Sequence, residues 1–339
     1  MSGASIPYHL RPHKAVDRRI FLDLLARLER WQPVADFTYL SMGAYPLEDH
    51  KLIHRLLGVT RLIAFDMDED VVSRQMFNRP ISSCRCVLRK SGEVVSNLQA
   101  LLNECDLGDA PGVIVWLDYT SPKKIGVQVR EFESLLDSDP VGPGSIVRVT
   151  VNANPRDQLQ PQNGPPRPIQ EIQAQQFQSL KNKLNDYLPT WASPELMNEE
   201  GLPRILAAAF SRAALNAFPP GGELEFLPLS LVRYADGQQM LSITGTVVRT
   251  ADLDSIREKL ALDKWPFASQ TWDTIHKLVV PDLTLRERLF LEREIVASDA
   301  TQIAAGLSFK AFADTSVGEF VSSYQNYYRF YPTLFSADP

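Results

Sequence analysis

Apolar and polar residues follow two different periods along the first half of the chain. Short runs that are almost wholly apolar recur there, and they are residues 37–42, 61–66, 84–88, 112–119 and 144–154. Between these runs apolar residues recur every three or four positions, as in residues 15–30, where Val16, Ile20 and Leu24 share one helical face. Apolar strands that alternate with amphipathic helices predict an α/β fold with a doubly wound parallel sheet.

The pattern changes after Pro155. The segment 155–170 is rich in Pro, Gln and Gly and cannot continue a sheet, so it predicts a linker or loop. Helical stretches follow, and two β-rich runs within 224–248 meet at Asp236-Gly237, a strong hairpin signal. The remainder is mainly helical and ends in an aromatic cluster, for which we favour packing of a terminal helix over base stacking.

These changes predict four parts. They are a Rossmann-like core (1–155), a helical insertion that acts as a lid (156–222), a β-hairpin that completes the sheet (223–250) and a helical C-terminal region (251–339). A parallel sheet finished by a late antiparallel pair is the layout of class I methyltransferases, whereas dinucleotide folds normally add a sixth parallel strand.

Polar and small residues follow four of the predicted strands, where parallel sheets bind ligands. They are Ser41 and Gly43 after the first strand, Asp66 and Met67 after the second, Ser91 and Gly92 after the third, and Asp118 after the fourth. Asp66 follows Gly43 at about the 20-residue spacing of an acid that accepts ribose hydroxyls. Because strand ends meet at one edge of the sheet, these residues predict a cofactor cleft.

The first loop indicates which cofactor this cleft would hold. It contains one glycine, Gly43, and lacks the G-x-G-x-x-G pattern that lets the backbone approach a pyrophosphate. Glu48 and Asp49 begin the next helix and would repel a pyrophosphate. S-adenosylmethionine carries a positive sulfonium and no phosphate, so the loop favours S-adenosylmethionine as the cofactor.

Three charged residues have more than one interpretation. Asp66 is either the ribose ligand or the cap of the next helix. Asp118 ends an apolar run and would orient the methionine amino group or the nucleophile, act as a general base, or merely cap a turn. Lys14 lies in a basic stretch and is a candidate for base chemistry or for contact with a phosphate-bearing substrate, although a solvated helix start is the more common outcome.

Histidines, cysteines and charge restrict the remaining options. His50 and His54 are four residues apart, but no third ligand has matching spacing, so we expect no metal site and regard them as surface histidines or partners to the cleft. Cys84, Cys86 and Cys105 are expected as free thiols in a reducing cytoplasm. No apolar run would span a membrane, and the net charge of −6 argues against bulk electrostatic binding of duplex nucleic acid.

Five runs carry a resemblance to a known family. They are "LRPHKAVDRRIF" (10–21), "YLSMGAYPLEDHKLIHRLLG" (39–58), "RQMFNRPISSCRCV" (74–87), "VIVWLDYTSP" (113–122) and "VRVTVNA" (147–153). Together they resemble a bacterial family named "putative S-adenosylmethionine-dependent O-methyltransferases". In that family an acid follows the second strand and a Leu-Asp-Tyr-Asp run follows the fourth, which implies site roles for Asp66 and Asp118. This chain departs from the pattern at Thr120, where the last Asp is usual, and at Pro46 in the first loop.

The sequence thus predicts a cytoplasmic S-adenosylmethionine-dependent methyltransferase whose acceptor is a small molecule, a protein or a nucleic acid. One alternative is a catalytically inactive, methyltransferase-like module that regulates or binds a partner, which the single-glycine loop favours. Another is a nucleic-acid-modifying methyltransferase, which the basic N-terminus and the aromatic tail favour. A partner protein or a homo-oligomer stays open, and no membrane partner is expected.

Overall fold

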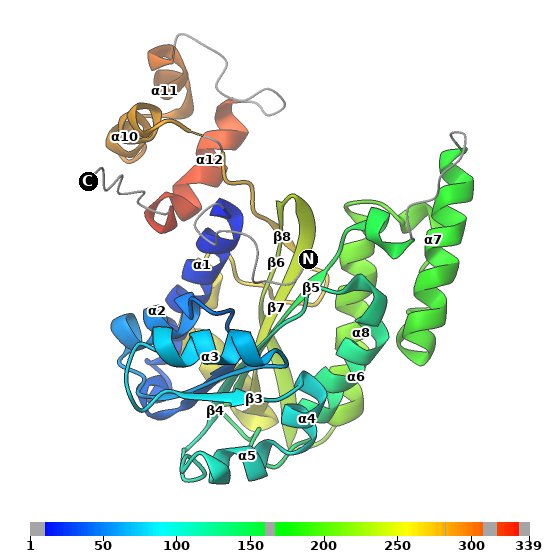
Figure 1. Ribbon diagram of the computed structural model, residues 1–339. Helices are drawn as coiled ribbons and strands as arrows, with labels where there is room; N and C mark the ends of the chain where they lie inside the picture. Colours follow the sequence, from blue (N-terminus) through cyan, green and yellow to red (C-terminus); the bar gives the residue numbers. More distant parts are fainter. Residues whose placement is uncertain (1–10, 160–166, 282, 308–316, 332–339) are drawn as a thin grey trace.

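The computed structural model describes residues 11–159, 167–281, 283–307 and 317–331. In this part of the chain one sheet of eight strands has the order β3-β2-β1-β4-β5-β7-β6-β8 (Figure 1). The strands are β1 (Thr38–Ser41), β2 (Arg61–Asp66), β3 (Arg85–Leu88), β4 (Val113–Asp118), β5 (Ile146–Asn152), β6 (Leu224–Asp236), β7 (Gln238–Arg249) and β8 (His276–Lys277). Neighbouring strands among β1 to β5 pair in parallel, whereas β7 pairs antiparallel with both β5 and β6. The predicted fold class, a parallel sheet finished by an antiparallel hairpin, is therefore confirmed.

Helices cover both faces of the sheet. They are α1 (Pro12–Leu28), α2 (Glu48–Leu57), α3 (Glu69–Asn78), α4 (Ser91–Ser96), α5 (Leu98–Glu104), α6 (Ile125–Leu136), α7 (Ile169–Leu184), α8 (Gly201–Ala217), α9 (Leu253–Leu260), α10 (Leu285–Glu294), α11 (Ala300–Gly306) and α12 (Val317–Tyr327). Apolar side chains of α1, α2, α9 and α12 share one buried cluster, and those of α4, α5, α6 and α8 share the other. The short helices α4 and α5 meet at Asn97.

Strands β6 and β7 form a hairpin with a tight turn at Gly237. Gly237 has φ of 85°, a left-handed value that glycine adopts without strain. Strand pairing continues to the tip, where Asp236 is opposite Gln238. This agrees with the prediction made from Asp236-Gly237, and it places a carboxylate at the end of β6.

The helical segment between β5 and β6, which contains α7 and α8, packs on the face of the sheet opposite α1. Its helix α8 lies against α6, where the rings of Phe210 and Phe132 meet edge-to-face with centroids 5.2 Å apart. Figure 1 shows α7 beside these two helices. Residues 160–166 of the predicted linker lie outside the described residues, and the lid role of α7 and α8 stays a prediction.

Aromatic residues of the C-terminal region pack in the interior, as expected. Tyr324 and Tyr327 are buried, and their ring centroids lie 5.5 Å apart. The hydroxyl of Tyr331 donates to the carbonyl of Pro281 at 2.8 Å. The last predicted aromatic positions, beyond residue 331, lie outside the described residues. Across the described ranges, every helix is too short or too polar to traverse a lipid bilayer.

Candidate functional site

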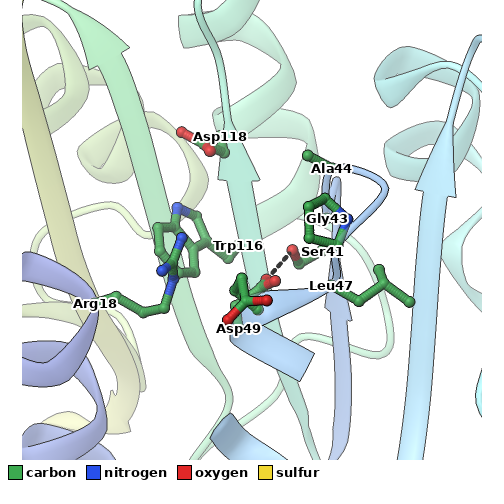
Figure 2. Close-up of a pocket in the computed structure, with 10 residues that line it drawn as sticks. Arg18, Ser41, Gly43, Ala44, Leu47, Asp49, Trp116 and Asp118 are labelled. Carbon is green, nitrogen blue, oxygen red and sulfur yellow. Dashed lines mark hydrogen bonds between the residues drawn. The ribbon is translucent and has the colours of Figure 1, made fainter. Parts of the chain in front are cut away.

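A cleft lies at the carboxyl ends of β1 and β4, where the strand order changes direction (Figure 2). Open α/β sheets bind ligands at such a switch point. The lining comes from α1, β1, the following loop, α2 and β4, and comprises Arg18, Ser41, Gly43, Ala44, Pro46, Leu47, Glu48, Asp49, Trp116 and Asp118. Its enclosed part measures about 20 Å³, room for about one water molecule. A larger ligand would therefore lie across its open side.

Asp49 anchors the start of α2 to β1. One carboxylate oxygen, Oδ2, accepts hydrogen bonds from the hydroxyls of Tyr39 and Ser41, each at 2.6 Å. Burial acts to raise the pKa of Asp49, but the charge and hydrogen bond of His50, with Arg18 and Ser41, together outweigh it and hold that pKa far below its usual range. The sequence placed Asp49 at a helix start, whereas the structure makes it a buried carboxylate in the wall of the cleft.

His50 supports the same loop from beneath. Its Nδ1 lies 3.3 Å from Asp49 Oδ1, and its Nε2 lies 3.0 Å from the carbonyl oxygen of Ile63. Burial lowers the pKa of His50, but the charge and hydrogen bond of Asp49 outweigh burial and raise it. The expectation of a surface histidine is wrong for His50, because the residue is fully buried, whereas its contact with Asp49 agrees with the other expectation, a partner to the cleft. His54 contacts the Val59 carbonyl at 3.0 Å.

The need for Gly43 comes from this packing. A Cβ there would lie 2.8 Å from Cε1 of His50 and 2.8 Å from Cδ2 of Leu47, closer than side chains tolerate. From α3, the amide of Gln75 donates to the Gly43 carbonyl. The amide of Asn78 donates to the Tyr45 carbonyl at 3.0 Å. The single glycine thus belongs to a strand-to-helix connection that side chains hold tightly.

Asp66 and Met67 lie at the same edge, on the neighbouring strand. Ser41 pairs with Ala64, so β2 runs on to Asp66 beside the loop that leaves β1. Burial raises the pKa of Asp66, although backbone N–H groups of Asp68 and Met67 act to lower it. The Met67 side chain is 67% exposed. The structure thus places these predicted residues, accessible, at the end of the strand beside β1, but neither of them lines the cleft.

Ser91 and Gly92 begin α4, after β3. Ser91 hydrogen-bonds to the hydroxyl of Tyr119, whose pKa is raised first by burial and then by Glu131. The same hydroxyl donates to Glu131 at 2.5 Å. A Cβ at Gly92 would come within 3.2 Å of Glu131 Oε1. Ser91 therefore contacts Tyr119 after β4, and Gly92 lies close to Glu131 of α6. Neither residue lines the cleft, and their role toward a cofactor stays a prediction.

Lys14 and Asp118, the two predicted catalytic residues, lie in direct contact. The ammonium of Lys14 donates to Oδ2 of Asp118. Only 6% of Lys14 is exposed, so the expectation of a solvated helix start is wrong. The other oxygen of Asp118, Oδ1, is buried without a hydrogen-bond partner in the part of the chain that the structure describes. Figure 2 shows Asp118 at the end of β4, above Trp116 and across the cleft from the Gly43 loop.

A buried ion pair supports the cleft from below. Arg148 on β5 donates to Asp17 of α1 at 2.5 Å, and its guanidinium lies 4.7 Å from the Trp116 ring centroid. The indole Nε1 of Trp116 donates to Thr150 at 3.0 Å. Sequence reasoning missed this pair. The available signal was a charge inside an apolar pattern, since Asp17 adjoins Val16 and Arg148 interrupts the run of β5.

The fold and the cleft define the class of protein. Strands β1 to β5 in the order 3-2-1-4-5, an antiparallel hairpin beside β5 and a polar switch-point cleft are the arrangement of class I methyltransferases. The family model described as "Putative O-methyltransferase" matches residues 6–338, and the chain belongs to this family. A comparison with curated proteins finds no match. The predicted resemblance is therefore confirmed at the level of the family.

Proposed function

We propose that the chain is an S-adenosylmethionine-dependent O-methyltransferase. The observation that carries this proposal is the charge pattern of the cleft at the switch point. Arg18 contributes a cation to its wall, and Asp118 and Asp49 contribute carboxylates. A zwitterionic amino acid needs groups of both signs, so this end of the cleft suits the methionine part of the cofactor.

Two residues beside the cleft, outside its lining, suit the other parts of the same molecule. Asp66 stands at the end of the neighbouring strand and is half-buried, which suits hydrogen bonds to ribose hydroxyls. Met67 offers an exposed apolar side chain beside it for a purine ring. The described lining shows no cluster of backbone amides built around glycines for a pyrophosphate, which favours an adenosyl compound over a dinucleotide.

When bound, the cofactor supplies an electrophilic methyl group at its sulfonium. The protein aligns the acceptor oxygen and removes its proton. Asp118 Oδ1, buried and without a described partner, would accept that proton. The adjacent Lys14 ammonium would stabilise the negative charge that develops as the proton leaves. Arg148 and Trp116 hold β4 in place beneath this pair.

Cofactor binding is tested by thermal shift with S-adenosylmethionine, S-adenosylhomocysteine, NAD and ATP. A ligand at 100 times its dissociation constant adds about 2.7 kcal/mol of stability. We expect a shift with both adenosyl compounds and a smaller one in Asp66→Ala. The absence of a shift with either adenosyl compound would remove the enzyme proposal.

Methyl transfer is tested by incubating the protein and labelled S-adenosylmethionine with a cell lysate, which is then separated into small-molecule, protein and nucleic-acid fractions. Asp118→Asn should reduce transfer more than it reduces cofactor binding. The second candidate function is a non-catalytic cofactor-binding module, which the single-glycine loop favours. Binding without label in any fraction would support that module, and label in nucleic acid would support the modification of nucleic acid.

A further inference from the structure

Helix α1 receives its N-terminal cap from a distant part of the chain. Arg11 occupies the N-cap position without a side-chain cap, and the first turn holds no acidic residue. The backbone N–H groups of His13 and Lys14 instead donate to Asp236, at 3.2 and 2.8 Å. These are the second and third helical positions, whose N–H groups an N-cap side chain normally serves.

Asp236 is held firmly at the tip of the β6–β7 hairpin. Pairing of the two strands extends to Asp236 itself, and Gly237 completes the turn. On the next strand, the Gln239 amide donates to the Ala153 carbonyl at 3.0 Å and joins the tip to the end of β5. A carboxylate at the end of a rigid hairpin is therefore a fixed reference point for α1.

His13 adds a third contact to the same carboxylate. Its Nδ1 lies 2.9 Å from Oδ1 of Asp236. Burial acts to raise the pKa of Asp236, but the hydrogen bonds from His13 and from the Lys14 N–H outweigh it and lower that pKa. The carboxylate is thus ionised at neutral pH and suits the positive end of the α1 dipole.

Lys14 is consequently held at both ends. Asp236 accepts its backbone N–H, and Asp118 accepts its ammonium. The backbone contact sets the rotation and height of the first turn, and the side chain then spans from α1 to the end of β4. Without the cap, the first turn of α1 would fray, and the backbone of Lys14 would no longer hold the side-chain ammonium in place.

We propose that Asp236 is a positioning residue of the methyl-transfer site, which caps α1 from the hairpin and thereby holds the Lys14 ammonium on Asp118. This inference rests on the proposed function, because it assigns the contact a purpose in methyl transfer. It gives the terminal hairpin a role in the site in addition to closing the sheet.

The first experiment measures how fast Lys14 reacts with an amine-selective acylating reagent, followed by mass spectrometry in native buffer. In Asp236→Ala the reaction at Lys14 should be about fivefold faster, the factor that ~1 kcal/mol of capping gives. Exposed Lys264 should react at an unchanged rate and serves as the internal reference. Asp236→Asn should lie between, since its amide oxygen still accepts one N–H. Asp254→Ala, which removes an exposed acid of α9, should match the wild type.

The second experiment measures methyl transfer and S-adenosylhomocysteine affinity in the same variants. Asp236→Ala should lower the transfer rate while the affinity stays within about twofold, and Asp236→Asn should recover part of the rate. If Lys14 reacts in Asp236→Ala at the same rate as in the wild type, the proposed positioning of Lys14 is overturned. If the variant transfers methyl groups at the wild-type rate, the proposed role of this contact in methyl transfer is overturned. If the wild type fails to bind S-adenosylhomocysteine, the proposed function fails, whereas faster labelling of Lys14 would still show that the hairpin holds this residue.

Discussion

The substitution Asp49→Asn tests whether the Asp49 carboxylate in the wall of the cleft stabilises the fold as strongly as its contacts indicate. Oδ2 accepts from two hydroxyls, those of Tyr39 and Ser41, while Oδ1 faces the His50 ring. An asparagine has one acceptor oxygen and one NH₂ group. In one orientation of the amide, its NH₂ group would face the hydroxyls of Tyr39 and Ser41. In the other orientation, the NH₂ group would face the ring N–H of His50.

The expected loss follows from the burial of the group. Removing one partner of a buried, hydrogen-bonded ion pair destabilises proteins by about 3–5 kcal/mol, because the remaining charge is left without compensation. Asp49 and His50 are both buried, and without the carboxylate burial would lower the pKa of His50, so the ring would lose its proton together with its ion pair. We therefore expect Asp49→Asn to lower the free energy of unfolding by about 3–5 kcal/mol.

Urea unfolding at neutral pH measures this loss, with the slope m compared between variants. Glu48→Gln is the matched control, because this neighbouring acid has a side chain that is 43% exposed and should change stability by no more than about 0.5 kcal/mol. The double variant Asp49→Asn/His50→Gln should lose less than the sum of the single losses by about 1 kcal/mol or more. A loss below about 1 kcal/mol for Asp49→Asn, or strict additivity, would refute the reasoning.

Three further predictions concern the same region. Because the pKa of His50 is raised on folding, its stabilising contribution is fully present below the ordinary value of 6.5 and is lost as pH rises through the folded value. Because the pKa of Asp49 is lowered, its contribution is present above 3.8 and is lost in acid. The urea midpoint should therefore fall toward both acid and alkaline pH, and His50→Gln should flatten its alkaline side. Gly43→Ala should cost about 1–3 kcal/mol and weaken S-adenosylhomocysteine binding measured by calorimetry, since its Cβ would meet His50; unchanged affinity and stability would contradict the packing argument. Arg148→Met should lose about 3–5 kcal/mol in urea because Asp17 would remain buried and unpaired, and a neutral effect would show that this pair adds no stability.

The fold was predictable because its signals are local. The parallel strands β1, β2, β4 and β5 are buried along most of their length, so each appears in the sequence as a continuous apolar run, as in β4, whereas the edge strand β3 is partly exposed. The hairpin depends on Asp236-Gly237, where the turn itself demands a glycine at positive φ. The strand β8 was not predicted, since a pair of residues, His276 and Lys277, carries no periodicity.

A site residue was predictable only where its position directly after a strand is enough to place it at the cleft. Ser41 and Asp118 lie at the edge of the cleft because β1 and β4 are parallel neighbours and both end there. The environment of Lys14 could not be predicted, because its partners come from β4 and β6. Likewise, His50 is buried by Asp49 and by a carbonyl of β2, and no periodicity of α2 reveals that neighbour.

The contacts of Lys14 also set an order for the maturation of a newly made chain. The sequence separation is 104 residues to Asp118 and 222 residues to Asp236. As the polypeptide leaves the ribosome from its N-terminus, the strands that carry the cleft emerge well before the hairpin does. Until then α1 lacks its cap, so a truncated or stalled product ending before β6 would retain the acid Asp118 but not the fixed lysine beside it.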